Sequence, residues 1–319
     1  MQPLWPKDDL SLTRKSIDKL HETLSTSFQQ RLQALGIDNG LLPYLKSFYI
    51  PFAAWINEKK SQSQHTLVLG INGAQGSGKS TLSQLVADVL EQGFGLTTAI
   101  LSIDDIYKTR QQRQQMSVDL HPLFKTRGVP GTHNTSLGIE LIKQTIALKK
   151  GEQLLYPVFD KGNDEPLPKS NWKTCNGPVD ILIFEGWCVG AQAQTKNALI
   201  QDVNSLEQHE DPHGIWRHLV NEHLKSDYKT LFDMLDCLIF LQIPNVDCVL
   251  KWRGLQEQKL ANKHQHEQHL MTAEKTLKRF IAHYERLTRF QLDDLPTCAD
   301  ITIQLGEDHQ MKQLSIRRP

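Results

Sequence analysis

The residues best suited to chemistry form one short run, Gly73-Ala74-Gln75-Gly76-Ser77-Gly78-Lys79-Ser80, which fits the pattern G-x-x-x-x-G-K-[ST]. Glycines at this spacing let successive backbone N–H groups point inward, and a following helix adds its positive N-terminus. Such a cradle binds a nucleoside triphosphate, with the lysine at the β- and γ-phosphates and the serine hydroxyl on Mg²⁺. The predicted nucleotide-binding residues are Gly73, Ala74, Gln75, Gly76, Ser77, Gly78, Lys79, Ser80 and Thr81.

Carboxylates follow two other apolar segments, at the points where predicted strands end. Asp104 and Asp105 follow the segment 99–103, and Glu185 follows the segment 179–184. Ligands collect at the carboxyl ends of parallel strands, so Asp104 is placed to take the proton of a substrate hydroxyl. Asp105 is a second candidate for this role, or it caps a helix. The candidate Mg²⁺ ligands are Ser80, Asp104 and Glu185, unless Glu185 is an exposed turn carboxylate.

Polar side chains that could contact a second substrate lie between these two segments. The runs 125–134 and 156–161 combine Gly and Pro with polar residues, as irregular loops on a rigid scaffold do. An anionic substrate would pair with a cation such as Arg127 or Lys161. Plain surface turns are the alternative interpretation of both runs.

Short apolar segments alternate with helical patterns and predict the scaffold of the site. The segments are 66–71, 99–103, 179–184, 237–243 and 300–305, and the main helical patterns are 80–90, 216–235 and 273–288. Strands that are apolar at consecutive positions are buried on both faces, which requires a parallel sheet covered by helices. The last segment alternates and could be an edge strand. We therefore predict an α/β fold, a doubly wound parallel sheet of five strands.

The first part of the chain differs from the rest. Residues 10–35 and about 42–60 are helical in pattern, so residues 1–64 are predicted to form an N-terminal helical extension. Residues 65–319 would then form the nucleotide-binding domain. Within it we expect a substrate-site insertion at about 106–178, with 161–178 as an exposed loop, and a lid at about 251–270.

Composition and charge exclude several classes of protein. The chain has 319 residues, 39% hydrophobic and 23% charged, with 36 basic residues balanced by 36 acidic ones. This is a globular composition with no basic excess for nucleic acid. The sequence has no apolar run of about 20 residues for a membrane helix and no apolar signal segment at its start. Its five scattered cysteines argue against a disulfide framework, and we expect a cytoplasmic protein.

Taken in order, these motifs resemble those of the P-loop kinases of small metabolites: uridine kinase, pantothenate kinase, phosphoribulokinase and ATP-dependent D-glycerate 3-kinase. The resemblance covers about residues 65–305 and is strongest to the glycerate kinase group. The motifs that carry it are Gly73–Ser80, Ser102-Ile103-Asp104-Asp105-Ile106-Tyr107, Arg127-Gly128-Val129-Pro130-Gly131-Thr132-His133, the run 156–161, Glu185-Gly186-Trp187, Trp252-Arg253-Gly254, Phe280 and Tyr284-Glu285-Arg286-Leu287-Thr288.

The resemblance implies a role for several positions. Asp104 would act as base on the acceptor hydroxyl, and Lys79 and Arg253 would act on the transferring phosphate. Arg253 has a structural alternative, an ion pair with Glu257 one helical turn further on. The acceptor-binding candidates are Asp105, Tyr107, Arg127, Thr132, His133, Asp160 and Lys161.

The expected activity is transfer of phosphate from ATP, with Mg²⁺, to a hydroxyl of a small metabolite, with D-glycerate as the expected acceptor. Alternatives are another small hydroxylated acceptor, as in pantothenate or uridine kinases, and a regulatory ATPase without an acceptor. Ile106 departs from the aromatic residue usual two positions after the base in uridine kinases, which argues against that option. Neither nucleic acid nor a membrane is an expected partner, and the sequence leaves the oligomeric state open.

Overall fold

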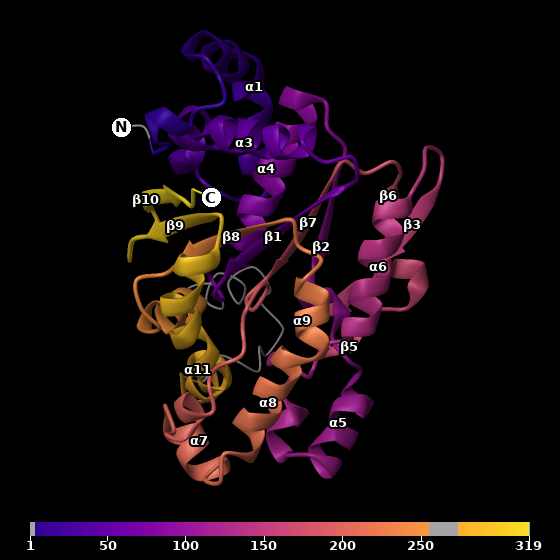
Figure 1. Ribbon diagram of the computed structural model, residues 1–319, viewed down its shortest axis with the longest axis vertical. Helices are drawn as coiled ribbons and strands as arrows, with labels where there is room; N and C mark the ends of the chain where they lie inside the picture. The colour runs from indigo at the N-terminus through magenta and orange to yellow at the C-terminus, as the bar shows by residue number, and fades with distance from the viewer. Residues whose placement is uncertain (1–3, 255–273, 319) are drawn as a thin grey trace.

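A central six-stranded sheet positions the rest of the chain, in the order β10-β9-β8-β1-β7-β2 (Figure 1). The structure is a computed structural model, and it describes residues 4–254 and 274–318. The strands of this sheet are β1 Leu67–Gly73, β2 Thr98–Ser102, β7 Ile181–Gly186, β8 Cys237–Gln242, β9 Ile301–Leu305 and β10 Met311–Ile316. Strands β1, β2, β7, β8 and β9 pair in parallel and confirm the predicted sheet of five strands.

The sequence analysis missed the sixth strand. Strand β10 pairs antiparallel with β9, so β9 is an inner strand rather than an edge. Among its side chains only Leu314 is buried. A mostly exposed strand has no continuous apolar run, which is why the apolar pattern did not reveal it.

Helices cover both faces of the sheet, as consecutive apolar residues in its strands require. On one face, Leu69 and Ile71 of β1 pack with the N-terminal helices and α4, and on the other Val68 packs with α6 and α9. The helices are α1 Arg14–Ala34, α2 Leu42–Tyr44, α3 Ile50–Ser61, α4 Lys79–Phe94, α5 Arg110–Asp119, α6 Thr135–Ala147, α7 Ser205–Glu210, α8 Ile215–Lys225, α9 Asp227–Phe232 and α11 Glu274–Cys298.

The pattern at 216–235 forms two helices instead of one. The helix is interrupted at Ser226, whose backbone (φ −107°, ψ −99°) is not helical. Leu224 and Tyr228 still face the same core on either side of the break, so the apolar spacing continues in phase across it. The break turns α9 toward α6, and the two helices pack together.

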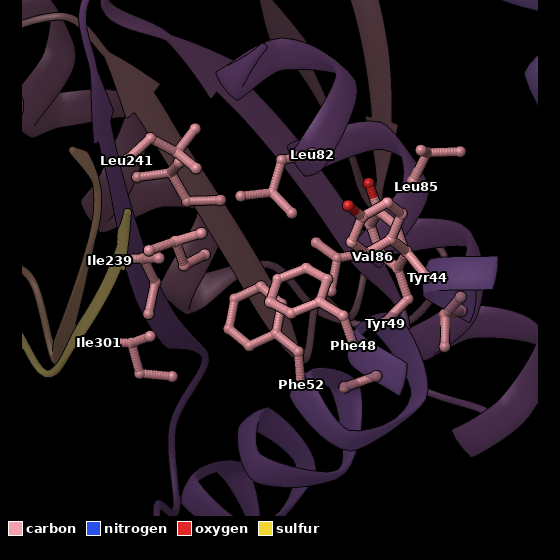
Figure 2. Packing of buried hydrophobic residues seen from close by; sticks show 14 of the residues in the cluster. Tyr44, Phe48, Tyr49, Phe52, Leu82, Leu85, Val86, Ile239, Leu241 and Ile301 are labelled. Atoms are coloured by element: carbon pink, nitrogen blue, oxygen red, sulfur yellow. The ribbon is translucent and has the colours of Figure 1, made fainter. Parts of the chain in front are cut away.

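The N-terminal helices share a core with the nucleotide-binding domain. Figure 2 shows the rings of Phe48 and Phe52 against Leu82 and Val86 of α4, and Ile239 of β8 lies in the same cluster. The two phenylalanine rings stack with their centroids 5.3 Å apart. Burying this many aromatic side chains is a large hydrophobic contribution, so residues 44–56 stabilise α4.

The insertion at about 106–178 contains α5, α6 and two small hairpins, β3 Gln153–Tyr156 with β6 Lys173–Asn176 and β4 Phe159–Asp160 with β5 Glu165–Pro166. The expectation of an exposed loop at 161–178 was therefore wrong for 165–166 and 173–176, which pair through their backbones with 159–160 and 153–156. Residues 251–254 are helical, and the rest of the predicted lid lies outside the described residues. In the described ranges, no helix combines the length and apolarity needed to cross a bilayer.

Candidate active site

The phosphate-binding run connects β1 to α4. Gly76 and Gly78 have φ of +81° and +90°, a left-handed backbone that glycine adopts without strain. Gly78 precedes the first residue of α4, and within the described residues no side-chain hydrogen bond caps the N-terminus of this helix. A Cβ atom on Gly78 would meet nothing within 4 Å, so the N-terminus of α4 faces open space. This is the geometry that binds an anion at a helix N-terminus.

The C-terminal part of the chain braces the phosphate loop from behind. The Nε2 atom of His309, in the turn between β9 and β10, lies 3.0 Å from the carbonyl oxygen of Gly76. The His309 ring packs on Trp252, with ring centroids 3.8 Å apart. A Cβ atom on Gly76 would lie 3.0 Å from the Trp252 side chain and 3.6 Å from the backbone nitrogen of Arg253. Arg253 is thus adjacent to the loop, whereas its alternative partner Glu257 is outside the described residues.

Two polar side chains of the loop are buried without a partner in the part of the chain that the structure describes. The atoms concerned are the amide nitrogen and oxygen of Gln75 and the hydroxyl oxygen of Ser77. Buried polar groups in proteins are nearly always hydrogen-bonded, so unpaired ones at a helix N-terminus indicate groups prepared for a ligand or for water.

The side chains of Ser80, in the first turn of α4, and Glu185, near the end of β7, are in contact. The hydroxyl of Ser80 donates to Glu185 Oε1 at 3.1 Å, because Glu185 stands near the end of β7, beside β1. Glu185 is 4% exposed, and its Oε2 atom has no hydrogen-bond partner among the described residues. A buried carboxylate oxygen without a partner is costly, and a divalent cation would satisfy it. The residues present therefore fit Mg²⁺.

Asp104 lies in a short 3₁₀ helix, Ile103–Ile106, directly after β2. Its Oδ2 atom accepts a hydrogen bond from Lys161 at 2.6 Å, and its Oδ1 atom accepts one from the Tyr107 hydroxyl at 2.9 Å. Burial alone would raise the pKa of Asp104, but the positive charges of Lys161 and Lys79 and both hydrogen bonds lower it well below its usual value. Asp104 is thus an ionised carboxylate within the electrostatic reach of the phosphate-loop lysine.

Two other predicted carboxylates have structural partners. Asp105 accepts a hydrogen bond from the backbone N–H of Phe159 at 3.1 Å, and burial raises its pKa. It is not a helix cap, since Ser102 caps the 3₁₀ helix. Asp160 accepts from the backbone N–H groups of Gly162 and Asn163 and forms their turn. Both carboxylates shape the hairpin that carries Lys161.

The loop 127–133 lies against the same segment. Arg127 donates to the carboxylate of Asp164 and, at 3.2 Å, to the carbonyl of Lys161. Thr132 is fully buried, with its hydroxyl accepting from Gly128 N–H at 3.0 Å and donating to the Val129 carbonyl at 2.7 Å. The hydroxyl of Thr132 therefore holds the loop in shape, and Arg127 links the loop to the Lys161 hairpin.

Four residues outside this loop support it, and the sequence analysis assigned that role to none of them; Trp187 and Tyr284 were named only as parts of the motifs that carry the resemblance. Trp187 donates its indole N–H to the Gly128 carbonyl at 2.9 Å, and the Tyr284 hydroxyl donates to the Arg127 carbonyl at 3.1 Å. Tyr228 and Lys108 hold the part at Gly131 and His133, as described below. Tyr228 lies within the predicted helical pattern 216–235, and its polar hydroxyl was the one signal that could have indicated a further role.

Comparisons with known proteins agree with this geometry. No family model matches the chain. The uncharacterized kinase mug58 of Schizosaccharomyces pombe is 28% identical over 251 residues, which cover 74% of this chain and 87% of that protein. The chloroplastic D-glycerate 3-kinase of Arabidopsis thaliana is 25% identical over 225 residues, 66% of this chain and 47% of that enzyme's length.

Among solved structures, D-glycerate 3-kinase from Cryptococcus neoformans var. grubii superposes with a TM-score of 0.71 at 22% identity. The match covers 85% of this chain and 99% of the fungal one, so nearly the whole fungal fold is present here. The sequence relatives are kinases, and the phosphate loop and the sheet have the arrangement that the resemblance implied. The chain is therefore similar to kinases in sequence, and its fold is similar to that of a D-glycerate 3-kinase.

Proposed function

We propose that this chain is an ATP-dependent kinase that phosphorylates a hydroxyl group of a small metabolite, with D-glycerate as its acceptor. The observation that carries the proposal is the environment of Asp104, an ionised carboxylate that pairs with Lys161 of the insertion and is influenced by the positive charge of Lys79 in the phosphate loop. A nucleotide-binding protein without an acceptor has no need of such a base. The likeness to glycerate kinases supports the choice of acceptor.

The phosphate-loop side of the site would bind and orient ATP. The backbone of residues 73–78 and the N-terminus of α4 would hold the phosphates, and Lys79 would neutralise charge on the γ-phosphate. Arg253, whose backbone lies next to Gly76, would add a second positive charge there. Since phosphoryl transfer has a loose transition state, positioning and charge neutralisation would supply most of the rate enhancement.

Mg²⁺ would be held by Ser80 and Glu185. The Oε2 atom of Glu185, which has no hydrogen-bond partner in the ranges 4–254 and 274–318, supports this assignment, whereas both oxygens of Asp104 already accept hydrogen bonds. When bound, the ion would neutralise phosphate charge and fix the orientation of the phosphates. We therefore assign Ser80 and Glu185 to the metal and Asp104 to the acceptor.

The acceptor side would orient and deprotonate the hydroxyl group. Asp104 would accept the proton as the hydroxyl oxygen bonds to the γ-phosphorus and the bond from that phosphorus to the β–γ bridging oxygen breaks, which releases ADP. Tyr107 and Lys161 would hold the carboxylate in place. The side chain of Lys161 is 58% exposed, so it is able to turn from Asp104 to the carboxylate of an incoming hydroxy acid. Arg127, already paired with Asp164, would support the loop rather than the acceptor.

The test is ATP consumption by the purified protein with glycerate, pantothenate, uridine or ribulose 5-phosphate, and without an acceptor. We expect glycerate to stimulate turnover and Lys79→Ala to reduce it by at least about 100-fold. Stimulation by another member of the panel would correct the acceptor. Hydrolysis that no acceptor stimulates would favour a regulatory ATPase, and full activity of Lys79→Ala would contradict the proposed site.

A further inference from the structure

The backbone of the loop at Gly131 and His133 is held by two side chains. The N–H groups of Gly131 and His133 donate to the Tyr228 hydroxyl oxygen at 3.0 and 3.3 Å. The carbonyl groups of the same two residues accept from Lys108 Nζ at 2.6 and 2.9 Å. Tyr228 comes from α9 and Lys108 from the segment after β2, so this part of the loop has a fixed position relative to Asp104.

The same hydroxyl group determines which nitrogen of His133 carries a proton. Tyr228 Oη lies 2.5 Å from His133 Nδ1. A phenolic oxygen can accept two hydrogen bonds and donate one. Because two backbone N–H groups occupy its acceptor positions, its own proton must point at Nδ1. Nδ1 is then an acceptor, and the neutral ring carries its hydrogen on Nε2. Burial lowers the pKa of His133 to about 3, which keeps the ring neutral.

The Nε2 atom of His133 has no hydrogen-bond partner within the described part of the chain. The residue is fully buried, so this N–H donor has lost its water without a replacement among the residues that the structure describes. The His133 ring stacks on Tyr107 with centroids 4.3 Å apart and an interplanar angle of 22°. Tyr107 in turn donates to Asp104 at 2.9 Å. The unpaired donor thus lies one ring away from the proposed base.

We propose that Tyr228 is a positioning residue: its hydroxyl donates to Nδ1 of His133 and so fixes the tautomer in which Nε2 of this expected acceptor-binding residue carries the hydrogen and can donate to an acceptor oxygen. The inference rests on the proposed function, and it identifies an uncharged donor on the acceptor side of Asp104. Its ligand is a carboxylate or hydroxyl oxygen of a small hydroxy acid. Such a group can bind an anion next to Asp104 without adding a charge that would weaken the base.

The first test is the tautomer itself, measured by ¹⁵N NMR of the full chain labelled at histidine, with His133→Gln used to assign the signal. We expect the wild-type signal of a neutral ring protonated at Nε2, and Tyr228→Phe to populate the Nδ1–H form. A wild-type ring protonated at Nδ1 would overturn the role of Tyr228. Tyr156→Phe is the matched control, since it removes another buried hydroxyl, bonded to Thr145 at 2.6 Å.

The second test compares two replacements of His133 by steady-state kinetics. His133→Asn keeps an acceptor near the position of Nδ1 but removes the Nε2 donor, whereas His133→Gln can place an amide N–H near the position of Nε2. We expect the acceptor KM to rise about tenfold or more in His133→Asn and less in His133→Gln, with the KM for ATP unchanged. Equal acceptor KM values for His133→Asn and the wild type would overturn the donor role.

The two tests separate this inference from the proposed function. If no acceptor stimulates the wild-type protein, the proposed function fails and the donor role fails with it, but the spectrum still decides the tautomer. If glycerate is phosphorylated and the tautomer is wrong, only the present inference fails. Circular dichroism and thermal unfolding of each variant show whether it folds.

Discussion

The Nζ atom of Lys161 lies 2.6 Å from the Oδ2 atom of Asp104, although the two residues are 57 positions apart in the chain. The contact joins the hairpin of the insertion to the end of β2. It means that the cation predicted to hold the acceptor also controls the charge of the proposed base. The lysine side chain is more than half exposed and the carboxylate is largely buried, so solvent has access to the lysine end of this ion pair.

Lys161→Met should raise the pKa of Asp104, because burial of the carboxylate remains while its strongest positive neighbour is removed. In the wild type the pKa lies below 3.8, so Asp104 stays ionised and causes no loss of activity between pH 5 and 8. In the variant, kcat/KM for the acceptor should fall at a higher pH than in the wild type. The measurement is the pH profile of both proteins, with the exposed Lys150→Met as control. An unshifted acid limb would show that Lys161 does not govern the base.

Asp104→Asn should lower kcat by about 10²- to 10⁴-fold, since the amide cannot take the proton of the acceptor hydroxyl. Binding of ATP should change much less, because the phosphate loop and α4 remain intact. The check combines initial rates with the affinity of the variant for ATP, measured by calorimetry. Similar losses in rate and in affinity would instead mean that Asp104 supports the structure of the phosphate loop.

Glu185→Gln should raise the Mg²⁺ concentration needed for half-maximal activity by about 10- to 100-fold, because a neutral amide is a poor substitute for a buried carboxylate ligand. Activity is measured at fixed ATP over a range of Mg²⁺ concentrations. The equivalent change Glu152→Gln, on the exposed turn before β3, should leave the Mg²⁺ dependence unchanged. An unaltered midpoint for Glu185→Gln would remove Glu185 from the metal site.

The stability of the protein should fall as the pH is lowered from about 6.5 to about 4. Burial lowers the pKa of His283 from 6.5 to about 4, so between these values the unfolded chain binds a proton that the folded chain does not. As far as His283 is concerned, the free energy of unfolding is highest above pH 6.5 and decreases by about 2 to 3 kcal/mol toward pH 4. Urea unfolding at several pH values measures this change.

His283→Gln should be less stable than the wild type at pH 7 but should lose less stability on acidification. His218→Gln is the matched control, because His218 makes the same contact to the carbonyl four residues earlier but is exposed. If both variants keep the wild-type slope, His283 is not the group responsible.

The sheet and the phosphate loop could be predicted because their signals are local. Consecutive apolar residues identified strands β1, β2, β7 and β8, an alternating pattern identified β9, and glycine spacing identified the loop between β1 and α4. The end of β2 and the end of β7 then placed Asp104 and Glu185 on the same side of the sheet. Each of these inferences uses only neighbouring residues and the general rule for parallel sheets.

The partners of these side chains could not be predicted, because they depend on how distant segments fold back. Nothing near Asp105 indicates that its carboxylate accepts from the N–H of Phe159, 54 positions later. Likewise, Tyr228 contacts His133 from α9, the helix that follows the interruption at Ser226. Periodic spacing of apolar residues does not reveal that interruption. The role of a polar residue in this site is therefore decided by tertiary structure more than by its type.

The aromatic side chains of Phe48 and Phe52 pack against α4, the helix that begins at the phosphate loop. At the other end of the chain, Gln310 accepts a hydrogen bond from Tyr44, and its neighbour His309 contacts Gly76. Deletion of the first sixty residues would expose an apolar face of α4 to water. It would also remove the Tyr44 contact to the turn between β9 and β10, which lies against the phosphate loop. Recombinant versions of this enzyme should therefore keep the amino-terminal helices, and affinity tags are better attached through a spacer than inserted in their place.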